Sequence, residues 1–129
     1  MARYLGIDAS TQSVSALLFD DAAGSVLAEA VVNFGADLPQ YHAPQGFIPD
    51  GPEGEVHSDP RMWLDALELC LKRLRDDGVN LGEVAAISGA GQQHGTVYLS
   101  AEGVAAIAGL QAGKPLAGQL ENGFSRKTS

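Results

Sequence analysis

The stretch RYLGIDASTQS, residues Arg3–Ser13, sets the interpretation of the whole chain. In its first half Tyr4, Leu5 and Ile7 favour a buried β-strand, and Gly6 leaves room for a close approach by backbone or ligand. Asp8 stands where that strand ends. The small and hydroxyl-bearing residues that follow can present hydrogen-bond donors to an anion, while a carboxylate can hold a hydrated cation. The segment therefore predicts a site for a nucleotide polyphosphate with Mg²⁺. The alternative is an ordinary hairpin turn in which Asp8 caps the backbone.

The composition is that of one globular domain. The chain has 129 residues, of which 45% are apolar and 19% charged, enough to bury a core without disulfides. Its lone cysteine, Cys70, excludes an intrachain disulfide and fits a reducing compartment. No signal-peptide pattern and no apolar stretch of membrane-spanning length occurs in the sequence. We therefore expect a cytoplasmic protein that does not enter a membrane.

The charge balance restricts the partners. Sixteen acidic residues against eight basic ones give a formal net charge of −8. Nucleic acids and anionic membranes are bound by basic surfaces, so neither is expected as a partner. A phosphate site remains compatible with this charge, because a few N–H donors and one Mg²⁺ act locally.

The pattern after the first strand predicts a β-meander. Residues 14–20 (VSALLFD) form a second apolar strand, Gly24 lies in a turn, and residues 26–32 (VLAEAVV) form a third strand. Tight connections between three consecutive strands indicate antiparallel pairing. The strands are apolar enough that we expect both faces of the sheet to be covered.

An irregular segment and a helix follow. Asn33–His57 is rich in proline and glycine, which indicates a long loop that is either functional or a plain surface insertion. Ser58-Asp59-Pro60 is typical of a helix start, and Gly78 of its end. The helical stripe predicted to face the core, with Trp63 and Cys70 as core residues, consists of Trp63, Leu67, Cys70, Leu71 and Leu74.

A second candidate loop follows the next strand. Residues 84–88 (VAAIS) predict a strand beside the first one, and GAGQQHG occupies positions 89–95. A dinucleotide-binding fingerprint is excluded, because His94 stands where its third glycine belongs and TVYL, which predicts a strand, follows. We expect Gln93 and His94 to hydrogen-bond the hydroxyls of a small polar ligand, although a structural role for His94 or a role as general base stays open. Beyond Ser100 a short helix over residues 104–110 is expected.

Taken together and in this order, YLGIDASTQS, VSALLFDDAAGSVLAEA, DPRMWLDAL and ISGAGQQHG resemble the N-terminal domain of the FGGY carbohydrate kinases, in particular the xylulose kinase group. The resemblance implies a ribonuclease-H-like, actin-type ATPase domain of the α/β class, with a mixed sheet whose first three strands are antiparallel. It also implies ATP and Mg²⁺ as cofactors and a sugar as substrate. In the family's pattern the phosphate-binding positions, with Asp8 at the metal, correspond to Asp8, Thr11, Gln12 and Ser13. The ketose-binding positions correspond to Gln93 and His94.

The chain departs from the family in length. Family members are several times longer, and their catalytic Asp and adenosine-binding segment lie downstream of the part that this chain resembles. Residues 1–129 are therefore expected to be a partial N-terminal FGGY kinase domain, incomplete at its C-terminus, without a catalytic residue and inactive alone. Two alternatives stay open. One is a kinase of another polyol or ketose, such as ribulose, glycerol or gluconate; the other is a non-catalytic actin-like module that self-associates through an exposed sheet edge.

Overall fold

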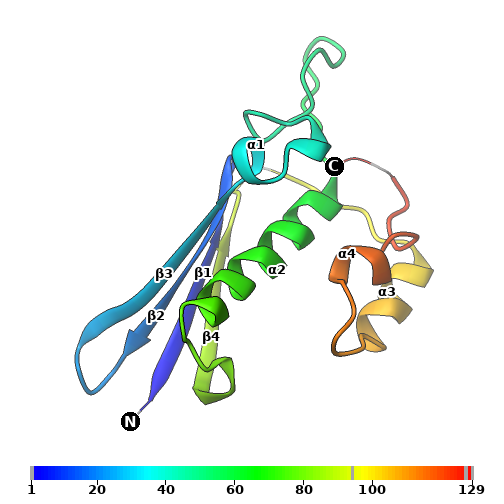
Figure 1. Ribbon diagram of the computed structural model, residues 1–129. Coiled ribbons are helices and arrows are strands. Elements are labelled where there is room, and N and C mark those ends of the chain that lie inside the picture. The colour runs from blue at the N-terminus through cyan, green and yellow to red at the C-terminus, as the bar shows by residue number, and fades with distance from the viewer. Residues whose placement is uncertain (1, 94, 127, 129) are drawn as a thin grey trace.

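The computed structural model describes residues 2–93, 95–126 and 128, and it contains a four-stranded sheet with one long helix packed against it (Figure 1). The strands lie in the order β3-β2-β1-β4. β1 pairs antiparallel with β2, and β2 with β3, whereas β4 runs parallel to β1. The predicted meander and the predicted place of the fourth strand are confirmed. The strand bounds are β1 Arg3–Ala9, β2 Ser13–Asp20, β3 Ser25–Asn33 and β4 Val84–Gly91.

The long helix, α2, spans Pro60–Asp76 as its sequence signals predict. Asp59 caps it by accepting a hydrogen bond of 2.9 Å from the backbone N–H of Arg61, and proline occupies the first turn, where its missing N–H costs nothing. After the helix, Gly78 takes a φ of +96°, a conformation that favours glycine. Both ends of this helix therefore follow from local chemistry.

The buried face of α2 is rotated relative to the predicted stripe. Cys70 and Leu74 are buried as expected, but Met62 and Ala66 are buried in place of Leu67 and Leu71, which are only partly buried. The thiol of Cys70 lies 3.3 Å from the carbonyl oxygen of Ala30, and burial raises its pKa. Its predicted role as a core residue is confirmed. The core between helix and sheet is formed chiefly by Leu5, Val14, Ala16, Val32, Phe34, Met62, Ala66, Cys70 and Leu74.

The expectation that both faces of the sheet are covered is wrong for the part of the chain that the structure describes. α2 packs against β2 and β3 on one face only. On the opposite face, which we call the outer face, Tyr4, Leu17 and Val31 are 39%, 38% and 55% exposed. The apolar pattern is correct, but a second covering layer is not supplied by residues 2–93, 95–126 and 128.

The remaining elements are short. The irregular segment holds α1 (Phe34–Asp37) and a 3₁₀ turn, η1 (Pro39–Tyr41), and a second 3₁₀ turn, η2 (Leu81–Glu83), precedes β4. α3 (Ala101–Ala108) confirms the predicted short helix, although it begins three residues earlier, after the Ser100 cap. With α4 (Leu116–Gln119) it forms a small group beside α2 (Figure 1).

The predicted strand at Thr96–Leu99 is wrong. Within it only Leu99 makes a β-bridge, to Phe124. A strand needs a partner along its length, and the described chain offers this segment a single bridging residue. No helix among the described residues is both long and apolar enough to cross a membrane.

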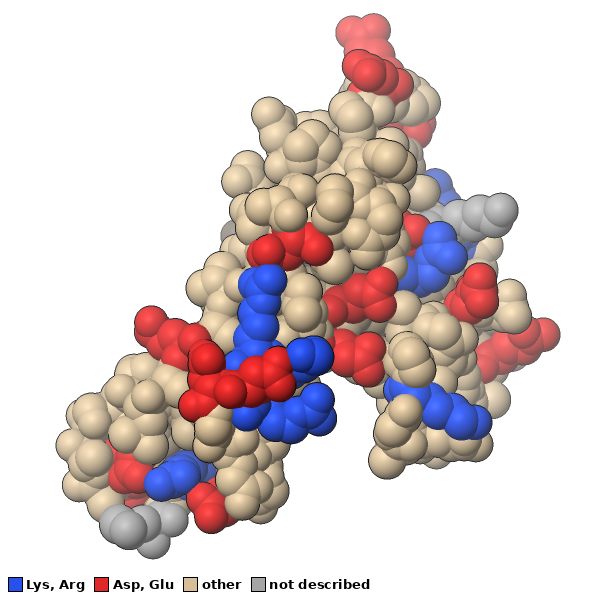
Figure 2. All heavy atoms as spheres, in the orientation of Figure 1, with Lys and Arg blue, Asp and Glu red and all other residues tan. Residues whose placement is uncertain are grey.

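Figure 2 shows acidic and basic side chains next to one another on the face that carries α2. The ion pairs there include Lys72 with Asp76 and Arg73 with Asp37. A cavity of about 680 Å³ separates α2 from the segment around Lys114 and Pro115. This cavity lies away from the strand ends that carry the two candidate loops, and its lining charges are mixed.

Candidate functional site

The sheet brings the two candidate loops together at the carboxyl ends of β1 and β4. Ala9 lies opposite Gly91 in the parallel register, and the side-chain amide of Gln92 donates a hydrogen bond of 3.2 Å to the carbonyl oxygen of Ser10. From this point the chain leaves β1 toward β2 but leaves β4 away from the sheet. Such divergence at parallel strand ends creates the crevice in which α/β proteins commonly bind ligands.

The loop after β1 is a tight turn with its polar groups in solvent. The N–H of Ser10 donates to the carbonyl oxygen of Ser13 at 2.8 Å, and the Ser10 hydroxyl donates to the Asp8 carboxylate at 3.1 Å. Asp8, Thr11 and Gln12 are exposed, and Ser13 is partly buried. The four predicted phosphate-site residues therefore share one accessible turn.

The irregular segment Asn33–His57 supports this turn. The N–H of Phe34 donates to the carbonyl oxygen of Gln12 at 3.0 Å. A Cβ atom on Gly46 would lie only 1.7 Å from the carbonyl oxygen of Thr11, so glycine is required where the two backbones meet. The hydroxyl of Ser58 in turn donates to the carbonyl oxygen of Gly46 at 2.6 Å. Of the two interpretations of the segment, this contact favours a part in shaping the site.

The side chains of Asp8 and Ala9 lie on opposite faces of the sheet, because successive side chains of a β-strand alternate between the two faces. Asp8 lines an open cavity of about 470 Å³ on the outer face, together with Leu17, Val31 and Ser88. Ala9 lines a smaller pocket of about 220 Å³ on the helix side, which we call the crevice pocket. The residues that line the crevice pocket are Ala9, Trp63, Gly91, Gln92, Gly95 and Val97.

The two predicted ligand-contact residues of the second loop, Gln93 and His94, stand in the sequence between Gln92 and Gly95, which line the crevice pocket. Gln93 is exposed, and His94 lies outside the described residues. Sequence reasoning missed Gln92, whose amide bridges the two loops, and treated Trp63 only as core. Trp63 does pack against the core cluster, but it also lines the crevice pocket. The apolar stripe gave no signal for this second role.

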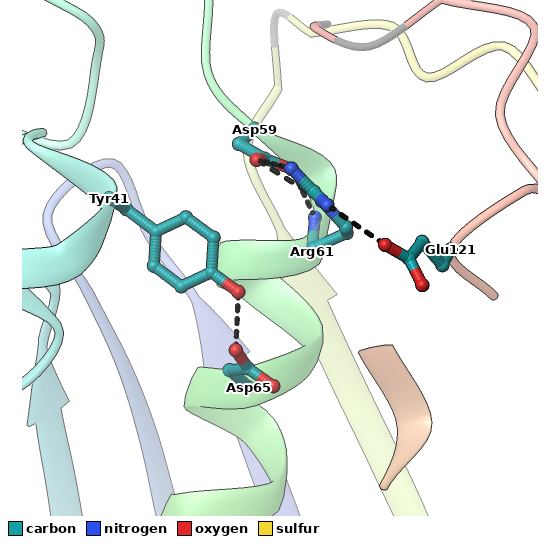
Figure 3. A network of polar contacts seen from close by, with 5 residues as sticks. All are labelled: Tyr41, Asp59, Arg61, Asp65 and Glu121. Carbon is teal, nitrogen blue, oxygen red and sulfur yellow. Dashed lines mark hydrogen bonds and ion pairs between the residues drawn. The ribbon is translucent and has the colours of Figure 1, made fainter. Parts of the chain in front are cut away.

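A polar network holds the surroundings of the N-terminal turn of α2 in place (Figure 3). The Tyr41 hydroxyl donates a hydrogen bond to the Asp65 carboxylate. The Tyr41 pKa is raised mainly because the side chain is partly buried, and this hydrogen bond raises it further. Arg61 pairs with Asp59 at 2.7 Å and lies 3.9 Å from Glu121. The hydrogen bonding to Asp59 raises the Arg61 pKa. The network thus joins the irregular segment and the chain after α4 to the helix that carries Trp63.

The oxygen ligands at the turn after β1 suit a magnesium ion that is held by one carboxylate together with water and phosphate. They do not suit a metal ion that is held by several protein side chains. No group of three or more His, Cys, Asp or Glu side chains suitable for a metal occurs among the described residues. Mg²⁺ is commonly bound through one or two carboxylates, with water and substrate phosphates supplying its other ligands. An exposed carboxylate such as Asp8 beside a donor-rich turn meets that requirement.

Comparison with known proteins relates the chain to sugar kinases. No protein-family model matches it. It is 39% identical over 127 residues to xylulose kinase 2 of Arabidopsis thaliana, covering 98% of this chain and 23% of that protein. It is 38% identical over 121 residues to the xylulose kinase of Mus musculus, covering 94% of this chain and 22% of that protein. The chain therefore spans about a fifth of the length of these relatives.

Solved structures agree on the fold. A xylulose kinase from Brucella ovis superposes with a TM-score of 0.60 and 28% identity, over 78% of this chain and 18% of that one. A gluconate kinase from Lactobacillus acidophilus gives a TM-score of 0.59 at 22% identity, a likeness of fold alone. The predicted resemblance to the FGGY kinases and their actin-like ATPase fold is confirmed.

Proposed function

We propose that residues 1–129 form part of the N-terminal domain of an ATP-dependent kinase that phosphorylates D-xylulose to D-xylulose 5-phosphate. The observation that carries the proposal is the meeting of the two candidate loops at the ends of β1 and β4, tied by the hydrogen bond from Gln92 to Ser10. Identities of 36% to 39% with xylulose kinases over nearly the whole chain support the substrate. Phosphoryl transfer depends mainly on positioning and charge neutralisation, which paired binding loops provide.

The residues of the two loops take different roles in this proposal. Asp8 holds Mg²⁺, which when bound offsets the negative charge of the phosphates. Thr11, Gln12 and Ser13 orient the phosphate oxygens through N–H and hydroxyl donors. Gln93 and His94 hydrogen-bond the ketose hydroxyls. No residue of this chain is assigned as the base, so these side chains bind and orient while the proton acceptor comes from elsewhere in the kinase.

The compartment proposed for this kinase is the cytoplasm. The buried free thiol of Cys70 fits a reducing environment, and the proposed reaction requires ATP.

A kinase assay tests the proposal. The protein translated from the gene that carries these residues is assayed for ADP formation with D-xylulose, D-ribulose, glycerol and gluconate. We expect the highest kcat/KM with D-xylulose. A clear preference for another of these substrates would move the assignment to that polyol or ketose.

Asp8→Asn removes the proposed metal ligand at nearly constant size. We expect kcat with D-xylulose to fall by roughly a hundredfold or more, because charge stabilisation in the transition state is lost. Asp21→Asn, in the exposed turn between β2 and β3, is the matched control and should retain activity. An Asp8→Asn enzyme as active as the control contradicts the role given to Asp8.

The 129-residue chain alone should bind D-xylulose weakly and turn over negligibly. It carries the two loops but not the opposing half of a cleft, so it can orient one side of the substrates only. ADP release that depends on D-xylulose and clearly exceeds the rate without protein would refute this expectation.

A second candidate, an actin-like assembly module, is favoured by one observation. β4 is an edge strand with no charged residue between Val84 and Gly91. At the other edge, Arg73 donates to the Val31 carbonyl oxygen at 2.6 Å, and the Asn33 N–H donates to Asp37 at 2.8 Å. Backbone groups of β3 are thus engaged by side chains, whereas β4 carries the features of an edge open to another strand.

A further inference from the structure

Gln92 and Ser10 occupy equivalent places on two neighbouring strands. Gly91 ends β4 opposite Ala9, which ends β1. Gln92 and Ser10 are the residues that directly follow them, so the parallel pairing of the strands sets where both lie. The side-chain Nε2 of Gln92 spans the gap and lies 3.2 Å from the carbonyl oxygen of Ser10. This contact therefore depends on the sheet and not on the course of the chain beyond Gln92.

The carbonyl group that Gln92 holds belongs to the same peptide unit as the N–H of Thr11. A peptide unit is planar and none of the described peptide bonds is cis, so this N–H points away from the Gln92 amide. No described residue accepts a hydrogen bond from it. By fixing the carbonyl group, Gln92 therefore also fixes the direction of an N–H donor that is available to an anion.

Ser10 extends the same restraint to Asp8. Its hydroxyl donates to the Asp8 carboxylate at 3.1 Å, and its N–H donates to the carbonyl oxygen of Ser13 at 2.8 Å. The hydroxyl, the N–H and the carbonyl oxygen of Ser10 are thus all engaged, and only the carbonyl oxygen has a partner distant in sequence. Without the Gln92 amide, Ser10 is held only by residues at most three positions away.

We propose that Gln92 is a positioning residue for the phosphate-binding turn. It acts through the peptide unit between Ser10 and Thr11, whose N–H it holds in the direction from which a phosphate oxygen of ATP accepts a hydrogen bond. The inference rests on the proposed function and adds to it a residue of the second loop that serves the nucleotide. Gln92 differs in this from the next residue, Gln93, whose proposed partner is the ketose.

Gln92→Met tests this role in the protein translated from the gene that carries these residues. Methionine has nearly the length of glutamine, but it has no N–H and adds no charge beside the phosphates. With ATP as the varied substrate we expect kcat/KM to fall by roughly three- to tenfold, the loss of one hydrogen bond, while KM for D-xylulose stays unchanged. Gln111→Met, the same change at an exposed residue beyond α3, is the matched control and should behave like the parent protein.

A ¹H–¹⁵N spectrum of the 129-residue chain gives a readout that does not depend on catalysis. We expect Gln92→Met to shift the backbone amide resonance of Thr11, because the peptide unit that contains it loses its restraint. Gln111→Met should leave that resonance in place. Thermal unfolding should give the same midpoint for the parent chain and both variants, because both glutamine side chains are exposed. An equal midpoint separates a positioning role from a structural one.

The other outcomes overturn the inference and are distinguishable from a failure of the proposed function. If KM for D-xylulose rises as much as kcat/KM for ATP falls, Gln92 acts on the sugar loop. If neither quantity changes, if the Thr11 amide does not shift, or if the unfolding midpoint falls, the hydrogen bond does not position the turn. In these cases the parent protein still phosphorylates D-xylulose, and the proposed function stands. A parent protein without kinase activity would overturn the proposed function and the inference together.

Discussion

At the scale of single residues, Asp37 shows how one carboxylate joins three parts of the fold. It accepts hydrogen bonds from the backbone N–H of Asn33 at 2.8 Å and from the guanidinium of Arg73 at 2.9 and 3.1 Å. Both hydrogen bonds lower the Asp37 pKa, and the one from Arg73 has the larger effect. The end of β3, the turn of α1 and the last turns of α2 are therefore coupled through an ionised group.

This coupling predicts a pH dependence of stability. A carboxyl whose pKa is lower in the folded state stabilises the fold above its unfolded pKa of about 3.9, and the contribution is lost as the pH falls through the folded pKa. We expect Asp37→Asn to reduce the free energy of unfolding by about 1 kcal/mol at pH 7, because the pair is partly exposed. Urea unfolding measured from pH 7 to pH 2 should show the difference between the two proteins shrinking below pH 4.

The control for this series is Glu53→Gln, at an exposed position of the irregular segment, which should track the parent protein at every pH. A constant difference between Asp37→Asn and the parent from pH 7 to pH 2 would show that Asp37 acts through its shape and not through its charge.

Predictions for single residues were correct where the role of a side chain depends on its neighbours in the sequence. They were less accurate where packing against the sheet decides which of several apolar side chains is buried. The Asp59 cap and the burial of Cys70 followed from type and spacing. The choice of Met62 over Leu67 for the core did not, because the two lie on opposite flanks of Cys70, about 140° apart around the helix, and only the position of the sheet decides which flank is buried. The pocket role of Trp63 depends in the same way on a loop distant in sequence.

At the scale of elements, the irregular segment is predicted to stabilise the turn after β1. Gly46→Ala places a Cβ atom 1.7 Å from the Thr11 carbonyl oxygen at a φ of +90°, so one of the two backbones must move. We expect a loss of more than about 2 kcal/mol in the free energy of unfolding. Because the displaced group belongs to the proposed phosphate site, nucleotide binding should weaken as well.

Gly54→Ala isolates the cost of the backbone conformation alone. Gly54 also has a positive φ, +77°, but nothing lies within 4 Å of the position of its Cβ, so the loss should be about 1 kcal/mol. Thermal unfolding and nucleotide titration of both variants provide the comparison. Equal losses for Gly46→Ala and Gly54→Ala would mean that the contact with Thr11 does not support the turn.

Elements were predictable from the sequence where their own residues define them. Strand propensity, the turn glycine and the helix signals gave β1, β2, β3 and α2. The strand predicted at Thr96–Leu99 is not formed, because a strand requires a neighbouring strand to pair with. The β-propensity of the residues does not indicate whether such a neighbour is present. The candidate loops were located correctly, but the bridge from Gln92 to Ser10 required the parallel register of β1 and β4.

At the scale of the whole molecule, the described chain has one covered face, one apolar outer face and one open edge. The outer face exposes Tyr4, Leu17 and Val31. The edge strand β4 contains no charged residue. Natural sheets commonly protect their edges with charges or proline, because unpaired strand edges recruit further strands. Both features therefore favour association of the 129-residue chain with a second copy through β4.

Ala86→Lys tests this association. It puts a charge in the middle of β4, and a charged side chain on an edge strand opposes pairing with another strand. We expect sedimentation velocity to show a concentration-dependent dimer for the parent chain and a monomer for Ala86→Lys. Ala22→Lys makes the same change of charge in the exposed turn between β2 and β3, away from the β4 edge, and should dimerise like the parent. If the parent is monomeric at every concentration, or if both lysine variants dissociate alike, then pairing through β4 is not how the chain associates.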